Sequence, residues 1–332
     1  MTRTERLLSA KASIRRLVGV AIVGCFAAFM PRAAGAGDPV LPTGGQVRVG
    51  KATIASAGGR TTVNQSTDRA VIDWQGFSVG RDASVTLTLP SAKSAVLNRV
   101  VGSATSAIAG SIQSNGQVYL VNPNGIAITR TGTVKVGGGF VASTLDISDE
   151  DFAAGRLRFS GTSAGTVSNA GTIAVGEGGL AGLFSNGGVD NSGVVSVPAG
   201  RVALGTGSAI TLDRSGTGFM QILAPATSGE GGEVGAGGKL RASGGRIEIK
   251  ASSAGKVVRD LVNLKGEANV SSIRRKGGVI VLDGGSGGVA VTGRLKASSV
   301  KAKGGTVRIG GKDIALRGAR VDASGASGGT VT

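Results

Sequence analysis

Short runs of alternating apolar and polar residues recur along the chain, separated by Gly or Asn. Segments 110–112 and 132–134 read Gly-Ser-Ile and Gly-Thr-Val and lie 22 residues apart, as do segments 168–175 and 190–197. Period-two alternation predicts short β-strands, and the Gly and Asn residues predict tight turns between them. A repeat of this length built from short strands is typical of a solenoid.

The last third of the chain repeats one theme at longer intervals. A Gly-Gly pair followed by an alternating run occurs at 244–249, 277–282 and 304–309, with spacings of 33 and 27 residues, and begins again at 328. The Leu pattern of leucine-rich repeats is absent. We therefore expect an all-β fold, a right-handed parallel β-helix whose coils stack on one another. Roughly 13 coils at about 4.8 Å each would form a column of about 60 Å.

Two segments depart from the repeat. The alternating residues 46–54 are expected to form an N-terminal cap over the first coil, with Trp74 and Phe77 packed beneath it. Segment 148–155 predicts a helical turn, with Ser148 as N-cap and three acidic residues in the first turn. The alternative for these carboxylates is a calcium site, although Ca²⁺ requires more oxygen ligands around it.

Composition narrows the chemistry that is available. Hydrophobic residues make up 40% of the chain, which argues against disorder, while the 60 Gly residues follow no period of three and so exclude collagen. The chain has no His and a single Cys, Cys25. The commonest general base, thiolate ligands and disulfides are therefore missing, and we expect no catalytic residue, metal site or cofactor.

Residues 1–36 have the order of a secretory signal peptide. A basic segment precedes the apolar run 17–29, and Ala34-Gly35-Ala36 offers a cleavage site. The run is too short for a permanent membrane span, so an integral membrane protein is not expected. A lipoprotein box ending at Cys25 and a twin-arginine signal at Arg15-Arg16 are the alternatives, but the apolar run continues beyond Cys25.

Positive charge is concentrated at the C-terminal end. Residues 37–232 hold 13 basic and 12 acidic residues, whereas residues 233–332 hold 18 and 7, a net charge of +11. Two interpretations stay open: the basic surface binds anionic glycans or a host cell surface, or the charge keeps a repetitive molecule soluble. Specific nucleic-acid binding is not expected, because aromatic stacking platforms are missing.

One block in the first half resembles a known family. The pentapeptide Asn122-Pro123-Asn124-Gly125-Ile126, at the end of the block 97–126, is similar to the secretion domain of filamentous haemagglutinin-type proteins. Segments 72–80 and 140–148 resemble that family's flanking blocks, and the resemblance covers residues 38–225. Several blocks in the right order are more specific than one motif.

The resemblance implies a two-partner-secretion exoprotein with a β-helical fold. Periplasmic domains of a dedicated outer-membrane β-barrel transporter would recognise the chain and export it to the cell surface, where it would fold. The remainder of such proteins acts as an adhesin, a haemolysin or the carrier stem of a contact-dependent toxin. The family's second motif, Asn-Pro-Asn-Leu, and the paired cysteines of haemolysin-type members are missing here, which favours a secreted adhesin.

Three segments follow from this interpretation. Residues 1–36 form the signal peptide, residues 37–225 the secretion (haemagglutination activity) domain, and residues 226–332 basic Gly-rich β-helix repeats. Because the chain stops at Thr332 in mid-pattern, we expect those repeats to be truncated, and a toxin domain beyond them remains an alternative.

The candidate site residues are Asn122, Pro123, Asn124, Gly125 and Ile126. Pro presets φ at the second position of a turn and Asn-Gly tolerates positive φ, so the motif predicts a strong turn. Whether it contacts the transporter or only shapes a corner of the solenoid stays open, and both can hold. Asn98 and Arg99 are secondary candidates.

Two other function classes are disfavoured by the sequence. A β-helical polysaccharide lyase or hydrolase needs carboxylates clustered on neighbouring coils, and no acidic pair recurs at the 22-residue spacing. We therefore do not expect an enzyme. A single-chain autotransporter would need a C-terminal membrane barrel, for which these residues show no pattern.

Overall fold

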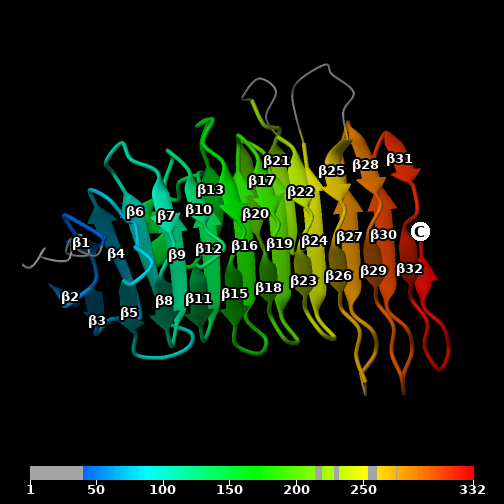
Figure 1. The fold of residues 1–332 in the computed structure, drawn as a ribbon, viewed down its shortest axis with the longest axis horizontal. Helices are drawn as coiled ribbons and strands as arrows, with labels where there is room; N and C mark the ends of the chain where they lie inside the picture. The colour runs from blue at the N-terminus through cyan, green and yellow to red at the C-terminus, as the bar shows by residue number, and fades with distance from the viewer. Residues whose placement is uncertain (1–39, 214–218, 228–231, 253–259, 274) are drawn as a thin grey trace, which may run out of the picture. The chain divides into compact units, whose positions relative to one another are not determined.

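The computed structural model describes residues 40–213, 219–227, 232–252, 260–273 and 275–332. The predicted signal peptide, including Cys25, lies outside these residues. The described chain from residue 40 onward is a parallel β-helix in which three sheets run side by side (Figure 1). The predicted fold class is thus confirmed.

The strands fall into three solenoid sheets. Sheet 1 contains β1 (Gln46–Val49), β4 (Arg69–Trp74), β6 (Ala95–Val100), β9 (Gln117–Val121), β12 (Gly139–Ser143), β16 (Leu180–Ser185), β19 (Arg201–Thr206), β24 (Arg246–Ala251), β27 (Val279–Asp283), β30 (Thr306–Gly310) and β33 (Thr330–Val331). Sheet 2 contains β2 (Ala52–Ala57), β3 (Arg60–Gln65), β5 (Ser84–Thr88), β8 (Ser111–Ser114), β11 (Thr133–Val136), β15 (Thr172–Val175), β18 (Val194–Ser196), β23 (Lys239–Arg241), β26 (Glu267–Asn269), β29 (Arg294–Lys296) and β32 (Arg320–Asp322). Sheet 3 contains β7 (Ser106–Ile108), β10 (Ile126–Ile128), β14 (Val167–Asn169), β17 (Val189–Asn191), β22 (Val234–Ala236), β25 (Asp260–Leu264), β28 (Gly288–Val291) and β31 (Asp313–Leu316).

The strand register follows the sequence repeats. Ser111 pairs with Thr133, as the 22-residue spacing predicts, and Ser168 pairs with Asp190. The Gly-Gly repeats align in the same way, since Val279 in β27 pairs with Thr306 in β30. Inward-facing Val, Ile and Leu side chains of successive coils therefore stack into one continuous buried core.

The expected number of coils is wrong. Sheet 1 has eleven strands in the described residues, and β1 is antiparallel to its neighbour, which leaves ten parallel strands rather than 13. Thirteen coils would require about 22 residues in every coil. Several coils are longer, because the chain leaves the solenoid between β12 and β14 and again between β19 and β22.

The predicted cap is present at residues 46–54. Strand β1 pairs antiparallel with β4, and β2 pairs antiparallel with β3, so both cover the first coil. Trp74 and Phe77 are 1% exposed and stack edge to face beneath this cap, with ring centroids 5.4 Å apart. A Cβ atom on Gly45 would lie 2.7 Å from the Trp74 ring, which shows how closely the cap packs.

The middle of sheet 1, from β9 to β19, is buried on both faces, which the repeat pattern does not predict. The segments that leave the solenoid, between β12 and β14 and between β19 and β22, form helix α1 and a three-stranded sheet. Helix α1 comprises Asp149–Ala153, and the sheet consists of β13 (Leu157–Ser160), β20 (Ala209–Leu212) and β21 (Met220–Ala224). These elements cover the outer face of β9, β12, β16 and β19 and enclose a second core. Most of the buried aromatic side chains among the described residues lie there: Tyr119, Phe152, Phe159, Phe184 and Phe219.

Helix α1 begins as the sequence predicts. Ser148 is the N-cap, and its Oγ accepts a hydrogen bond from the Asp151 backbone N–H at 3.1 Å. The acidic residues face arginines: Asp149 contacts Arg99 at 2.7 Å, and Asp151 contacts Arg156 at 2.5 Å. No group of three or more potential metal ligands occurs in the described residues. Nor does the described part of the chain contain a helix long and apolar enough to cross a membrane.

The three sheets continue past residue 225 without a break. Strand β19 pairs with β24 across this position, and β18 pairs with β23. The division proposed at residue 225 therefore rests on charge and sequence pattern and stays a prediction.

A buried carboxylate fastens the second core to the solenoid. Glu248 in β24 is 0% exposed and accepts hydrogen bonds from the backbone N–H groups of Phe219 at 3.2 Å and Met220 at 2.9 Å. Arg246 contacts one of its oxygens, and the Lys250 Nζ lies 3.4 Å from the other. Burial raises the pKa of Glu248, but Lys250, the Met220 N–H and Arg246 outweigh it, so the pKa is lowered.

We expect Glu248→Gln to lower the free energy of unfolding at pH 7 by about 1–3 kcal/mol, because charge-assisted hydrogen bonds are lost. Because the pKa of Glu248 is lower in the folded state, the ionised carboxylate stabilises the fold fully at pH values above its ordinary pKa of 4.5. This stabilisation is lost as the pH falls through the folded-state pKa. Urea denaturation of both proteins at pH 7 and at about pH 3 measures this. The difference in free energy of unfolding between the wild-type chain and Glu248→Gln should narrow at low pH. A difference that stays constant would contradict the stabilising role of the ionised Glu248 carboxylate.

Candidate recognition site at the Asn122 turn

Asn122 lies at the corner between β9 and β10, and its side chain is fully buried. Its Nδ2 donates to the Ala104 carbonyl and to the Ser106 Oγ, each at 2.9 Å. Its Oδ1 accepts from the backbone N–H of Asn124 at 2.9 Å. The side chain thus connects the turn to the segment that leads into β7.

The predicted turn is present at residues 122–125. The Gly125 N–H donates to the Asn122 carbonyl at 3.1 Å, which closes the turn. Gly125 has a φ of +113°, a conformation that side chains disfavour, so Gly at this position suits the turn. The Asn124 Nδ2 adds a hydrogen bond to the Gly102 carbonyl at 2.8 Å.

The other motif residues have contrasting surroundings. Ile126 is 2% exposed and packs in the solenoid core, whereas the Pro123 side chain is exposed. The Pro123 carbonyl accepts a hydrogen bond from the Ser163 Oγ. Asn122, Gly125 and Ile126 therefore shape the corner, and only Pro123 and part of Asn124 reach the surface.

Asn98, a secondary candidate, is also fully buried. Its Oδ1 accepts from the Trp74 Nε1 at 3.0 Å, and its Nδ2 donates to the Tyr119 carbonyl at 3.3 Å. The side chain connects three neighbouring strands of sheet 1, because these residues belong to β4, β6 and β9. In the folded chain Asn98 is a structural residue.

Arg99 connects the solenoid to the start of helix α1. Its guanidinium donates to Asp149 at 2.7 Å, to Asp146 at 2.9 Å and to the Ile147 carbonyl at 2.6 Å, and it lies 3.4 Å from Asp73. Burial lowers the pKa of Arg99, but the hydrogen bonds to Asp149 and Asp146 outweigh it and hold the pKa above its ordinary value. The side chain is 15% exposed, so one edge still reaches solvent.

The two groups of predicted residues meet at one surface hollow. Its lining, here called the recognition hollow, consists of Arg99, Val100, Val101, Gly102, Ser103, Val121, Pro123, Asn124 and Asp146. Val101 is 52% exposed, so its apolar side chain is accessible from the hollow. The hollow thus presents an apolar Val and an apolar Pro between an Arg and an Asp.

Sequence reasoning missed Val101 and Asp146. Val101 directly follows a run of buried β6 residues and reads as part of the core. Asp146 lies 47 positions from Arg99 in the chain, so no local pattern connects them. The signal for Val101 in the sequence is its position directly before Gly102, because a Gly indicates that the strand ends there.

Comparison with known proteins identifies relatives of this chain. The TPS secretion domain family matches residues 39–297. A heme/hemopexin-binding protein from Haemophilus influenzae is 41% identical over 107 residues, which cover 32% of this chain and 12% of that protein. A second protein of the same description from Haemophilus influenzae is 36% identical over 116 residues, covering 35% of this chain and 12% of the relative. The matched segment therefore spans only a small part of these curated relatives.

Two solved structures resemble the fold. The HMW1 secretion domain from Haemophilus influenzae has a TM-score of 0.77 and 33% identity, covering 87% of this chain and 76% of that structure. The filamentous hemagglutinin secretion domain has a TM-score of 0.57 and 18% identity, covering 88% of this chain and 98% of that structure. The second likeness concerns the fold alone.

Proposed function

Because this chain belongs to the TPS secretion domain family, the family of two-partner secretion, we propose that it is part of a secreted surface exoprotein. Its partner would be a dedicated outer-membrane β-barrel transporter, whose periplasmic domains recognise the secretion domain and which exports the chain to the cell surface. The observation that carries this proposal is the family match over residues 39–297, together with the capped coils and the Asn122 turn inside it.

We further propose that the recognition hollow is a contact surface for the transporter. The buried residues of the Asn122 turn set its shape, and Val101 and Pro123 supply exposed apolar contacts. The two interpretations of the motif are then complementary, since the turn must form for the surface to exist.

The exported protein is proposed to act as an adhesin, by binding rather than by catalysis. Three carboxylates close to basic groups are engaged in structure: Glu248 contacts Arg246 and Lys250, Asp151 contacts Arg156, and Asp149 contacts Arg99. Adhesion of beads coated with the exported protein to epithelial cells, compared with albumin-coated beads, tests this role; equal adhesion would exclude it.

We expect Val101→Asp to reduce export through the transporter at least about tenfold, since a charge replaces an apolar contact at the hollow. Val300→Asp is the matched control, because Val300 is 72% exposed and lies outside the hollow. The measurement is the amount of protein in the medium relative to the periplasm, with thermal unfolding of both purified variants to confirm an intact fold. Equal export of the two variants would remove the hollow from the proposal.

A further inference from the structure

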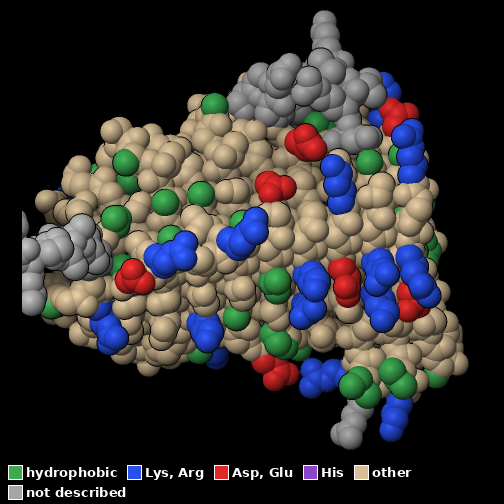
Figure 2. Space-filling view, viewed as in Figure 1, with side chains coloured by type: hydrophobic (Ala, Val, Ile, Leu, Met, Phe, Trp, Pro, Cys, Tyr) green, Lys and Arg blue, Asp and Glu red, His purple; other side chains and the backbone are tan. Residues whose placement is uncertain are grey.

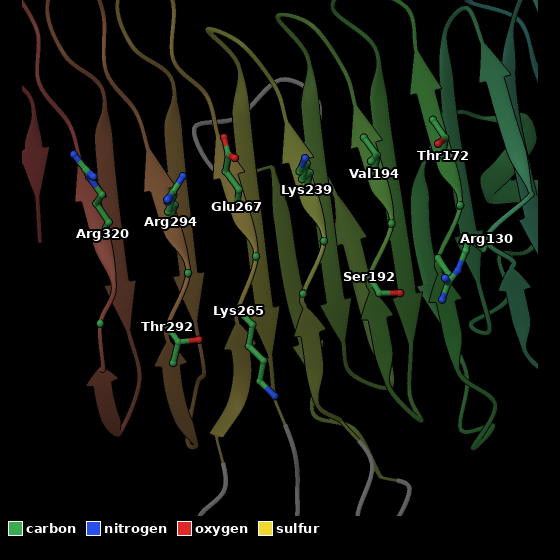
Figure 3. A pocket seen from close by; sticks show the side chains of 18 residues that line it. Arg130, Thr172, Ser192, Val194, Lys239, Lys265, Glu267, Thr292, Arg294 and Arg320 are labelled. Carbon is green, nitrogen blue, oxygen red and sulfur yellow. The ribbon is translucent and has the colours of Figure 1, made fainter.

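A long groove follows the corner between sheets 3 and 2. Its floor consists of turn glycines that stack from coil to coil: Gly171, Gly193, Gly238, Gly266 and Gly293. A Cβ on any of them would lie within 2.3 Å of a carbonyl oxygen of the neighbouring coil, so this floor has no room for side chains. The groove is therefore a bare strip of backbone that runs along the solenoid axis (Figure 3).

Two rows of side chains flank this strip. One row is a single register column of sheet 2, in which successive strands place the same position side by side: Thr172, Val194, Lys239, Glu267, Arg294 and Arg320. The other row comes from the ends of sheet 3 strands and their turns: Arg130, Ser192, Lys265 and Thr292. Figure 3 shows the two rows on either side of the turns.

The groove is strongly basic, and its lysine and arginine side chains lie at the surface. Lys239, Lys265, Arg294 and Arg320 are exposed, and none of the ion pairs found between described residues involves them. The one carboxylate, Glu267, accepts a hydrogen bond from the Asn269 Nδ2 at 3.0 Å. Figure 2 shows Lys and Arg side chains over β23, β29 and β32, with an acidic side chain between them. Cations along a groove concentrate the field that attracts anions.

We propose that this groove binds a linear sulfated polysaccharide lying along the solenoid axis. The register column crosses six strands, about 24 Å at the usual spacing, so it matches an extended polymer rather than a compact ligand. Arg and Lys suit sulfate and carboxylate groups, and the hydroxyls of Thr172, Ser192 and Thr292 suit sugar hydroxyls. The lining, all of it in the described part of the chain, contains no aromatic residue on which a nucleobase could stack.

This ligand class rests on the adhesin role proposed above. The test of the groove, however, does not depend on export. The purified chain is titrated with a heparin oligosaccharide by calorimetry, at two salt concentrations. The variant Lys239→Gln/Arg294→Gln/Arg320→Gln should weaken binding at least about tenfold and reduce the salt dependence. The control Lys301→Gln/Arg308→Gln/Lys312→Gln removes the same charge from exposed residues outside the groove, and its affinity should change less than about threefold.

A second variant separates the groove from net charge. Thr292→Trp places a bulky side chain at the edge of the strip without changing the charge, and it should weaken heparin binding by a similar factor while the thermal unfolding midpoint stays unchanged. Equal losses in both triple variants, or unchanged binding by Thr292→Trp, would overturn the proposal in favour of diffuse charge attraction. Equal affinity for desulfated heparin or for single-stranded DNA would overturn the sulfated polysaccharide as the ligand. Loss of binding with normal export would leave the secretion proposal intact.

Discussion

Replacing Gly238 with Ala is expected to disrupt coil stacking and to lower the free energy of unfolding by about 3 kcal/mol. The added Cβ would lie 2.0 Å from the Gly193 carbonyl oxygen of the preceding coil. That same oxygen accepts the Lys239 backbone N–H at 2.8 Å, so relieving the clash also breaks a hydrogen bond between the coils. Gly266 stacks on Gly238 in the same way, and the distortion therefore extends to both neighbours.

The adjacent residue supplies the control for this substitution. A Cβ on Gly237 meets nothing within 4 Å, and the φ of Gly237 is not in the positive range, so Gly237→Ala should be close to neutral. Urea denaturation of both variants, followed by circular dichroism, measures the difference. Similar losses for the two substitutions would show that the glycine floor is not tightly packed.

Replacing Asn122 with Ala is expected to cost about 2–4 kcal/mol of stability and to reduce export. The substitution leaves the Ala104 carbonyl, the Ser106 Oγ and the Asn124 N–H without the partners they have now, at a position that is 0% exposed. Each unsatisfied buried group costs about 1–3 kcal/mol. Because the turn shapes the recognition hollow, export should fall together with stability.

Pro123→Ala is a control for stability alone within the same turn, because Pro123 also lines the recognition hollow. Its side chain is exposed, and the hydrogen bond to the Pro123 carbonyl from Ser163 survives the change. Its stability should change by less than about 1 kcal/mol. The measurements are urea denaturation and the amount of each variant in the medium. If Asn122→Ala is as stable as the wild-type chain, the buried hydrogen bonds do not have the structural role given to them here.

Much of the solenoid could be predicted from sequence because its interactions are repetitive. A coil repeat is a local pattern, so the spacing of Gly110-Ser-Ile and Gly132-Thr-Val is sufficient to predict the pairing of Ser111 with Thr133. The helical turn at Ser148 and the cap at 46–54 follow from local capping and alternation in the same way.

The second core could not be predicted, because its partners are distant in the chain and share no repeat. Strands β9, β12 and β16 are buried on both faces, and a continuously apolar strand does not show in its sequence what covers it. Likewise, Asn122 could be recognised as a turn residue, but its partners Ala104 and Ser106 are supplied by the previous coil. The recognition hollow depends on the same kind of contact, between Arg99 and Asp146.

Export of the wild-type chain with and without its co-expressed cognate outer-membrane transporter tests the central claim most directly. We predict that the protein reaches the medium only when the transporter is present and otherwise stays in the periplasm. Release of equal amounts without the transporter would contradict this claim and would reduce the family likeness to a shared fold.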